Sequence, residues 1–181
     1  EIVTGDWSSD VCSSDLAYSK FKFDQLVRKE LDQEHGQIVG LRYFNVYGPH
    51  EEHKGTMASV AYHLHNQLKK SDQIKLFEGS DGYENGEQRR DFIYVNDVVK
   101  VNLWFLCHKD ISGIFNVGTG KSQTFNEVAQ AVIDWNKKGE IVYIPFPENL
   151  EGAYQSYTEA DITNLKEVGY EEEFLDVKQG V

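Results

Sequence analysis

The 181-residue sequence is poor in cysteine, proline and basic residues, and it contains no long hydrophobic run. Two cysteines are too few for a disulfide scaffold, and neither lies in a spacing that would indicate structural zinc. Since no apolar run reaches the roughly 18 residues of a membrane span, we expect no membrane partner. Lys and Arg number 18 against 30 Asp and Glu, for a net charge of −12, so the basic surface typical of nucleic-acid binding is absent from the composition.

Apolar residues, in contrast, are present in ordinary amounts. Hydrophobic residues make up 40% of the chain and aromatic residues 13%. That is enough apolar surface for a core, which excludes wholesale disorder. At this length we expect one ordinary domain or part of a larger one. The composition therefore indicates an acidic globular protein, for which we expect a cytoplasmic location.

Residues 1–16, EIVTGDWSSDVCSSDL, differ from the rest of the chain. They contain no Lys or Arg and no helix or strand periodicity, and Ser-Ser-Asp occurs twice in them. They lack the charged start and continuous apolar stretch of a signal peptide. Residues 6–16 resemble one reading frame of a common sequencing-adapter oligonucleotide. We therefore interpret 1–16 as non-native sequence fused to a protein fragment; the alternative is a natural low-complexity arm.

The remaining chain alternates between helical and strand-like patterns. Helices are predicted at about 21–34, 56–70, 97–106, 125–135 and 158–168. Short apolar strands are predicted at 38–44, 74–77, 92–95, 114–117 and 141–144. Loops are predicted at 45–49 and 80–88. The alternation predicts an α/β fold with a mainly parallel sheet.

One feature of doubly wound sheets is missing from this pattern. Such sheets usually open with a strand and a glycine-rich turn, whereas here the pattern opens with a helix. No GxGxxG occurs in the sequence. Gly118-Thr119-Gly120 follows a predicted strand but lacks the third glycine, so we interpret it as a strand-to-loop turn.

Four segments together carry a resemblance to a known family: YSK (18–20), RYFNVYGP (42–49), RDFIYVNDV (90–98) and FNVGTG (115–120). The last three resemble the second half of the extended short-chain dehydrogenase/reductases, the superfamily of nucleotide-sugar epimerases and dehydratases. Within it, the chain is most similar to the ADP-L-glycero-D-manno-heptose 6-epimerase family. The strings that carry this similarity are HKGTMASVA (53–61), KLFEGS (75–80), VNLWFL (101–106) and IPFP (144–147). The resemblance covers 17–181.

The resemblance implies a fold and its ligands. The fold would be the C-terminal part of a Rossmann-like doubly wound sheet plus a small α/β substrate-binding domain, without the N-terminal glycine-rich βα units. We expect 17–55 to be a remnant of the NADP-binding domain and 56–181 to be mainly substrate-binding, with 96–120 returning to the Rossmann sheet. NADP is the implied cofactor and an ADP-sugar the implied substrate; no metal is implied. A homo-oligomer is implied for the full-length protein.

The superfamily uses Tyr-x-x-x-Lys on a helix, where this spacing places both side chains on one face. The Tyr exchanges a proton with the sugar, and the Lys binds the nicotinamide ribose and assists the Tyr. Tyr18 and Lys22 fit this spacing. In heptose epimerases, however, the string reads Tyr-x-Tyr-Ser-Lys, which makes Lys20 the catalytic and cofactor-binding lysine. We favour this second register, in which the partner tyrosine is absent because Leu16 occupies its position.

The resemblance assigns a second acid/base to Lys54, which would also contact the cofactor. An epimerase returns hydride to the opposite face of a keto intermediate, so a proton donor on that side is useful. The alternative is a solvated surface lysine. Val46 is a further cofactor contact. The implied substrate-binding residues are Asn45, Thr56, His63, Phe77, Glu78, Gly79, Ser80, Arg90 and Tyr154.

Three of these assignments have alternatives or departures. Arg90 is assigned to the nucleotide phosphates because a guanidinium fork suits a pyrophosphate. Arg89 competes with it, since the 80–90 segment is longer than the usual loop of the family. Thr56 stands where the family often has Ser, and its hydroxyl can make the same bond. His63 would otherwise be an ordinary helix-face histidine.

These assignments imply an isomerase that oxidises C6 of an ADP-heptose to a ketone and reduces it from the other face, with NADP regenerated each cycle, for lipopolysaccharide core synthesis. One alternative is another sugar-nucleotide enzyme of the superfamily, such as a hexose 4-epimerase or a dehydratase. Another is a non-catalytic fragment. Because the glycine-rich unit and the tyrosine are missing, we expect the chain as written to be inactive and to bind NADP weakly.

Overall fold

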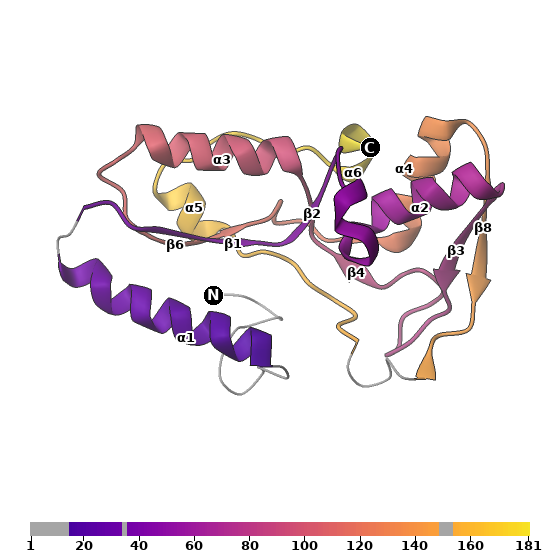
Figure 1. Cartoon of the computed structure of the whole chain (residues 1–181), viewed down its shortest axis with the longest axis horizontal. Helices are drawn as coiled ribbons and strands as arrows, with labels where there is room; N and C mark the ends of the chain where they lie inside the picture. Colours follow the sequence, from indigo (N-terminus) through magenta and orange to yellow (C-terminus); the bar gives the residue numbers. More distant parts are fainter. Residues whose placement is uncertain (1–14, 34–35, 149–153) are drawn as a thin grey trace.

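The computed structural model describes residues 15–33, 36–148 and 154–181 (Figure 1). The segment interpreted as non-native falls, up to residue 14, outside the described residues. The helices are α1 Asp15–Glu30, α2 Val60–Lys70, α3 Val95–Cys107, α4 Phe125–Asn136, α5 Thr163–Glu167 and α6 Val177–Gly180, with 3₁₀ turns at Leu31–Gln33 and Glu52–Met57. The strands are β1 Val39–Tyr43, β2 Asn45–Tyr47, β3 Gln73–Phe77, β4 Arg89–Arg90, β5 Phe92–Tyr94, β6 Gly113–Val117, β7 Gln123–Thr124 and β8 Glu140–Ile144.

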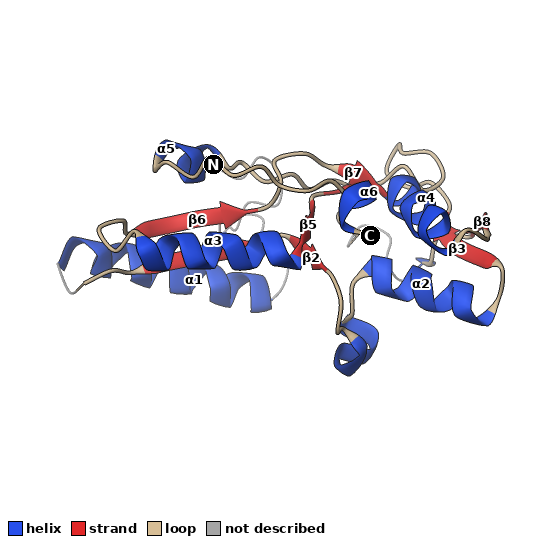
Figure 2. Ribbon diagram, turned by 90° about the horizontal axis from the view of Figure 1, so that it is seen from above, coloured by secondary structure: helices blue, strands red, loops and turns tan. Residues whose placement is uncertain are grey.

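The strands form short pairs, most of which are parallel. β1 pairs with β6, β2 with β5 and β3 with β8, all in parallel, and β4 pairs with β7 antiparallel. The predicted α/β class with mainly parallel pairing is therefore confirmed. Figure 1 shows α1, α3 and α5 around β1 and β6 at one end of the molecule, and α2 and α4 beside β3 and β8 at the other. Figure 2 shows β2 and β5 between these two ends.

Each end has its own apolar core, and the residue spacing explains both. Leu64 and Leu68 lie one turn apart on α2 and are fully or almost fully buried against β3 and α4. Ile74 and Leu76 alternate along β3 toward the same core. The core at the other end joins α3, β5, β6 and α5, with Val101 buried at its centre.

The side chain of Arg42 on β1 ties α1 to this second end. Its Nε and Nη2 atoms donate to Oδ2 of Asp24 at 2.8 and 2.6 Å. Both side chains are largely buried, so this ion pair is screened less than a surface pair. Asp24 lies one helical turn after Lys20, so the contact fixes the part of α1 that carries the predicted catalytic lysine.

The structure corrects two predicted boundaries around the central strands. The segment predicted as a loop at 45–49 begins with β2, which pairs with β5. The helix predicted from residue 56 begins only at Val60, because Gly55 has a φ of +55° and Ser59 caps the helix by accepting a hydrogen bond from the amide of Tyr62.

The helix predicted at 158–168 is much shorter than expected. α5 covers only Thr163–Glu167, because the residues before it hydrogen-bond to another part of the chain. The amide of Thr158 donates to the carbonyl of Arg89, and Tyr157 forms a bridge to the same residue. This segment therefore hydrogen-bonds to β4 and cannot join the helix.

A buried carboxylate connects the middle of the molecule. Asp91 is fully buried between β4 and β5. Its Oδ1 accepts from the amide and the hydroxyl of Thr119 at 2.7 and 2.8 Å, and its Oδ2 accepts from the amides of Gly120 and Ala160 at 2.9 and 3.0 Å. A Cβ atom at Gly118 would lie 2.7 Å from Oδ2 of Asp91, so glycine is required there.

These contacts also explain the role of the Gly118–Gly120 turn. Burial raises the pKa of Asp91, and the hydrogen bonds from Thr119, Ala160 and Gly120 oppose that change. Because two amides of the turn already donate to Asp91, they are not free to bind a phosphate. The structure thus agrees with the interpretation of this sequence as a turn.

Asp91→Asn should destabilise the fold strongly. The side-chain amide of the new asparagine has only one acceptor oxygen, and its NH₂ group faces the N–H groups that bond to the second carboxylate oxygen of Asp91. These buried N–H groups lose their acceptor, at a cost of about 1–3 kcal/mol each. Chemical denaturation of both forms would measure the change in the free energy of unfolding. Asp134→Asn on the exposed side of α4 is the control and should change it little. A similar small change for Asp91→Asn would contradict the role given to this carboxylate.

Candidate functional site

Two adjoining cavities bring together most of the predicted site residues. The first, of about 270 Å³, is lined by four of them: Asn45, Val46, Lys54 and Arg90. The second, of about 180 Å³, is lined by three: His63, Phe77 and Tyr154. Val60 and Phe125 line both cavities, so the two lie side by side. We call them the lysine cavity and the tyrosine cavity.

Arg90 joins the two cavities. Only 9% of this residue is exposed, and its guanidinium carbon lies 5.1 Å from the centre of the Tyr154 ring. Its Nη1 donates to the carbonyl of Arg89 at 3.0 Å. Within the described ranges, Arg90 makes no ion pair with a carboxylate. Burial lowers the pKa of Arg90, while the neighbouring Tyr154 opposes this change.

A buried guanidinium without a carboxylate partner is costly unless an anion compensates it. Arg90 therefore marks the place where a negatively charged ligand would be most strongly stabilised. Tyr154 is a suitable neighbour, because burial raises the pKa of its phenol and keeps it uncharged, although Arg90 acts in the opposite direction. An anion at this place could therefore accept hydrogen bonds from the Arg90 guanidinium and contact the aromatic ring of Tyr154.

The adjacent arginine has a different environment. Arg89 donates through Nε to the hydroxyl of Ser122 at 3.1 Å and through Nη2 to the carbonyl of Ser122 at 2.6 Å. Two of its three guanidinium nitrogens therefore already have acceptors within the protein. Of the two arginines of β4, only Arg90 lines the lysine cavity.

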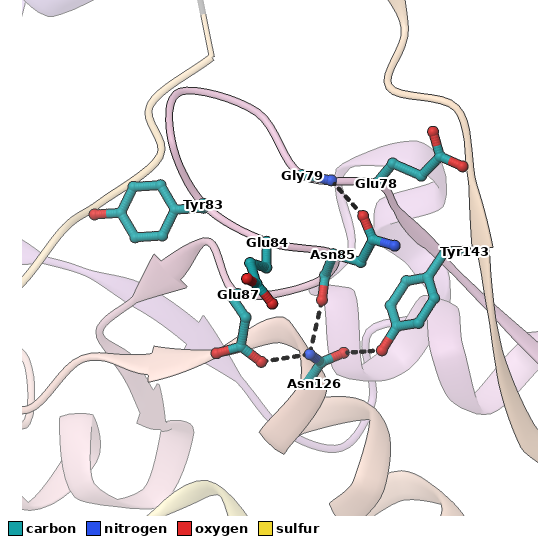
Figure 3. A pocket seen from close by; sticks show the side chains of 8 residues that line it. All are labelled: Glu78, Gly79, Tyr83, Glu84, Asn85, Glu87, Asn126 and Tyr143. Carbon is teal, nitrogen blue, oxygen red and sulfur yellow. Dashed lines mark hydrogen bonds between the residues drawn. The ribbon is translucent and has the colours of Figure 1, made fainter.

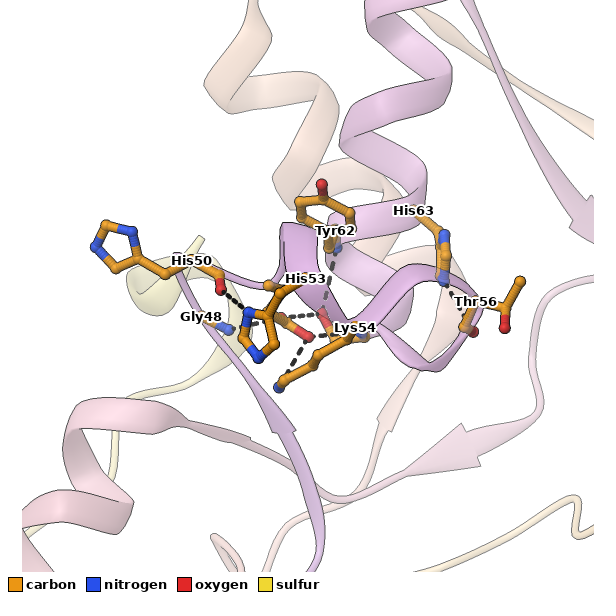
Figure 4. Close-up of polar contacts among 9 residues, drawn as sticks. Gly48, His50, His53, Lys54, Thr56, Tyr62 and His63 are labelled. Carbon is orange, nitrogen blue, oxygen red and sulfur yellow. Dashed lines mark hydrogen bonds and ion pairs between the residues drawn. The ribbon is translucent and has the colours of Figure 1, made fainter.

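Glu51 organises the loop that carries Lys54. Figure 4 shows this loop with Gly48, His53 and Lys54 labelled. It is 3% exposed, and it accepts hydrogen bonds from the amide of Gly48, the amide and hydroxyl of Ser59, and Nζ of Lys54. Burial alone raises the pKa of Glu51, but the hydrogen bonds from Ser59 and Gly48 and the charge of Lys54 outweigh it, so the pKa lies below 4.5. The carboxylate is thus held ionised beside the lysine.

Asn45, Thr56 and His63 take defined places around these cavities. Asn45 donates through both its backbone N–H and Nδ2 to the carbonyl of Asp91, at 3.1 and 3.2 Å. Thr56 is exposed and lines neither cavity, and its carbonyl oxygen lies 3.3 Å from Nε2 of His63. His63 projects from α2 at the edge of the tyrosine cavity (Figure 4).

The predicted substrate loop forms a third, open pocket of about 760 Å³, which is lined by Glu78 and Gly79 (Figure 3). Asn126 at the start of α4 holds this loop, because its Nδ2 donates to the carbonyl of Asn85 and to Oε1 of Glu87, at 2.9 and 2.6 Å. Ser80 faces inward and accepts a bond from Nε2 of Gln88 at 3.2 Å.

The proposed first lysine lies apart from these cavities. Lys20 is on α1, is exposed, and lines none of the three cavities. Tyr18 and Lys22 are also exposed, with Nζ of Lys22 5.4 Å from the centre of the Tyr18 ring. The side chain of Leu16 lies outside the described residues.

Three residues that contribute to the site were not predicted from the sequence: Glu51, Gln88 and Asn126. Glu51 stands three residues before Lys54, and this spacing was the signal that could have found it. Gln88 and Asn126 give no such signal, since their partners are distant in the sequence. In the described part of the chain, no group of three or more His, Cys, Asp or Glu could hold a metal ion. None of the described helices is long and apolar enough to cross a membrane.

Comparison with known proteins places the chain in a family. The model of the NAD dependent epimerase/dehydratase family matches residues 9–118. The chain belongs to this family. It is 58% identical over 164 residues to the ADP-L-glycero-D-manno-heptose-6-epimerase of Alkalilimnicola ehrlichii, which covers 91% of this chain and 51% of that protein. The chain thus spans about half the length of the curated relative it matches.

Solved structures agree with this assignment. The ADP-L-glycero-D-manno-heptose-6-epimerase of Helicobacter pylori superposes with a TM-score of 0.72 at 30% identity, over 93% of this chain and 49% of that one. The UDP-glucose 4-epimerase of Thermotoga maritima, solved with UDP-glucose, gives a TM-score of 0.69 at 28% identity, over 91% and 49%. The resemblance to nucleotide-sugar epimerases and the Rossmann-like fold class are therefore confirmed.

The stability of this epimerase-family chain should depend on the ionisation of Glu51. Its folded pKa is lower than 4.5, so the stabilisation is complete above that pH and is lost as the pH falls through the folded value. Chemical denaturation at a series of pH values from neutral to below 4.5 would show this loss. Glu51→Gln should remove that component, whereas Glu52→Gln, at an exposed neighbour, should keep it. An unchanged pH dependence in Glu51→Gln would contradict the account.

Proposed function

We propose that residues 17–181 are the C-terminal part of an ADP-L-glycero-D-manno-heptose 6-epimerase, a cytoplasmic isomerase of lipopolysaccharide core synthesis that uses NADP. The observation that carries the proposal is the buried Arg90 in the cavity that also contains Lys54. The 58% identity to a heptose epimerase supports the choice of sugar. In this proposal 17–55 belongs to the cofactor domain and 56–181 is mainly substrate-binding. The parallel pairing of β1 with β6 supports a return of 96–120 to the Rossmann sheet.

In this function Arg90 binds the pyrophosphate of the ADP-sugar as a bidentate donor. Tyr154, Phe77 and His63 line the adjoining cavity and are proposed to enclose the ligand there. Asn45 lines the lysine cavity and is proposed to contact the sugar. Thr56 and the loop residues Glu78, Gly79 and Ser80 are proposed as further substrate contacts. Phosphate contacts hold the substrate equally before and during the reaction, so they serve binding more than rate.

Lys54 carries a proton to or from the sugar oxygen on one face of the ketone. Its side chain lines the lysine cavity, with Nζ 3.3 Å from Oε2 of Glu51. Inversion at C6 needs proton transfer on both faces, and the second donor is the tyrosine whose place Leu16 occupies, next to Lys20. We therefore propose that the 181-residue chain by itself is inactive.

The described residues could contact one part of a nicotinamide cofactor but do not provide a site for its phosphates. Bound NADP supplies a hydride acceptor and donor. Val46 and Lys54 line the lysine cavity and are proposed to contact it, together with Lys20 on α1. The turn at 118–120 cannot hold its phosphates, since the amides there donate to Asp91. The phosphates need a glycine-rich turn and helix N-terminus of the kind found in complete Rossmann domains.

Apolar side chains are exposed on α1 and α3, which supports the proposal that other protein surfaces cover these helices. Phe23 and Leu26 on α1 are 64% and 54% exposed, and Leu103 and Leu106 on α3 are 55% and 63% exposed. Apolar stripes of this kind are normally covered. We propose that the remainder of the full-length protein and a homo-oligomeric partner cover them, and that the isolated chain is poorly soluble.

The proposal is tested by assaying the full-length protein that contains 17–181 with two substrates. ADP-glycero-manno-heptose should be converted to its C6 epimer, followed by nuclear magnetic resonance, without net consumption of NADP. A UDP-hexose should not be epimerised at C4. Conversion of the UDP-hexose alone would favour the rival 4-epimerase, which the Thermotoga neighbour represents. Turnover of neither substrate would overturn the proposed activity.

Lys54→Ala in the full-length protein should reduce epimerisation by about 10²–10⁴-fold, the usual cost of removing a general acid/base. Cofactor binding should remain, because other residues hold most of NADP. Lys100→Ala is the matched control: Lys100 also pairs with a buried carboxylate three residues earlier, Asp97, at 2.8 Å. The control should keep full turnover. Equal turnover in Lys54→Ala would identify Lys54 as a surface charge.

Arg90→Ala should raise KM for the ADP-sugar more than it lowers kcat, because its phosphate contact exists in both the ground and transition states. Arg89→Ala removes the contacts to Ser122 and should lower stability while leaving KM near its original value. Steady-state kinetics of both variants separate the two roles. The reverse pattern would mean that the pyrophosphate is bound by Arg89.

A further inference from the structure

We propose that Glu51 is a positioning residue that fixes Lys54 for proton transfer and links it to the helix that carries His63. This inference deepens the proposed function and rests on it. The sequence analysis did not single out Glu51, although its spacing of three residues from Lys54 was a signal. The argument comes from the arrangement of hydrogen bonds around a carboxylate that is almost completely buried.

Three hydrogen bonds that do not involve Lys54 hold the Glu51 carboxylate in place. Oε1 accepts from the amide of Gly48 at 3.1 Å and the hydroxyl of Ser59 at 2.6 Å, and Oε2 accepts from the amide of Ser59 at 2.7 Å. Two of these donors are backbone groups on opposite sides of the loop. The carboxylate therefore cannot rotate or move without breaking the loop closure, and it is 3% exposed.

Lys54 completes this arrangement from the cavity side. Its Nζ lies 3.3 Å from Oε2, and its side chain is 41% exposed. A pair of mobile surface groups contributes little, because both side chains lose rotamer freedom. Here only the lysine is mobile, and the anion that locates it is already held. The ammonium is thereby kept at the wall of the cavity that Arg90 also lines.

Ser59 connects the Glu51 carboxylate to α2, the helix that carries His63. Its hydroxyl donates to Glu51 and accepts from the amide of Tyr62, so it caps the N-terminus of α2. His63 follows one turn later on this helix and lines the tyrosine cavity. A single chain of bonds thus connects Lys54, Glu51, Ser59 and α2. Displacement of α2 would move the anion that locates the lysine.

The test is a double-mutant cycle on kcat in the full-length protein. Glu51→Gln should lower kcat by about 10²-fold, the cost of misplacing a reacting group by about 1 Å. KM for the ADP-sugar should stay nearly constant, since Arg90 is untouched. Combining Glu51→Gln with Lys54→Ala should give no loss beyond that of Lys54→Ala alone, because both act through the same group. Glu52→Gln, at the exposed neighbour, should retain full kcat.

The outcomes separate the two proposals. If the two losses multiply, Glu51 acts on the fold and the positioning role is overturned; unchanged kcat in Glu51→Gln overturns it as well. Ser59→Ala keeps the charge of Glu51 and removes one bond, so it should show a smaller loss of kcat at constant KM even if Glu51→Gln does not fold. Absence of epimerisation in the unchanged protein would overturn the proposed function. Full turnover in Lys54→Ala would leave that function standing and overturn the roles of Lys54 and Glu51.

Discussion

The candidate site depends on one buried carboxylate, Asp91. Four hydrogen bonds from the turn at 118–120 and from Ala160 converge on its two oxygens, so three distant segments are held at one point. The carbonyl of the same residue accepts two bonds from Asn45, and Arg90 directly precedes it. Because a buried carboxylate cannot leave its donors without large cost, the backbone at Asp91 is held in place, and with it the point from which the Arg90 side chain starts.

Glu51, which lines the lysine cavity, is a second buried carboxylate that is held by several hydrogen bonds. Both carboxylates are buried and accept four bonds, of which backbone amides supply three at Asp91 and two at Glu51. Their electrostatic surroundings differ, because Glu51 has a lysine partner, whereas Asp91 has only neutral donors. Burial accordingly dominates at Asp91 and raises its pKa, while at Glu51 hydrogen bonds and the charge of Lys54 outweigh burial. One carboxylate thus fixes the fold at the site, and the other fixes a charged group within it.

Much of this architecture could be predicted from the sequence, because local periodicity encodes it. Leu64 and Leu68 predict the buried face of α2, and the α/β class follows from the alternation of elements. β2 could not be predicted, since three residues become a strand only through pairing with β5. The start of the last predicted helix was wrong because Thr158 hydrogen-bonds to β4, a distant segment.

For the candidate site, the family resemblance supplied cavity-lining residues, but it could not supply residues that act only through tertiary contacts. The resemblance pointed to Lys54 and Arg90, which line one cavity. It gave no indication of Glu51 or Asn126, whose roles consist entirely of holding other residues. A crystal structure of the full-length protein with its ADP-heptose bound tests the whole account most directly. We predict the pyrophosphate against the Arg90 guanidinium with the sugar directed toward Lys54; a nucleotide bound elsewhere, with Arg90 still donating to the Arg89 carbonyl, would contradict it.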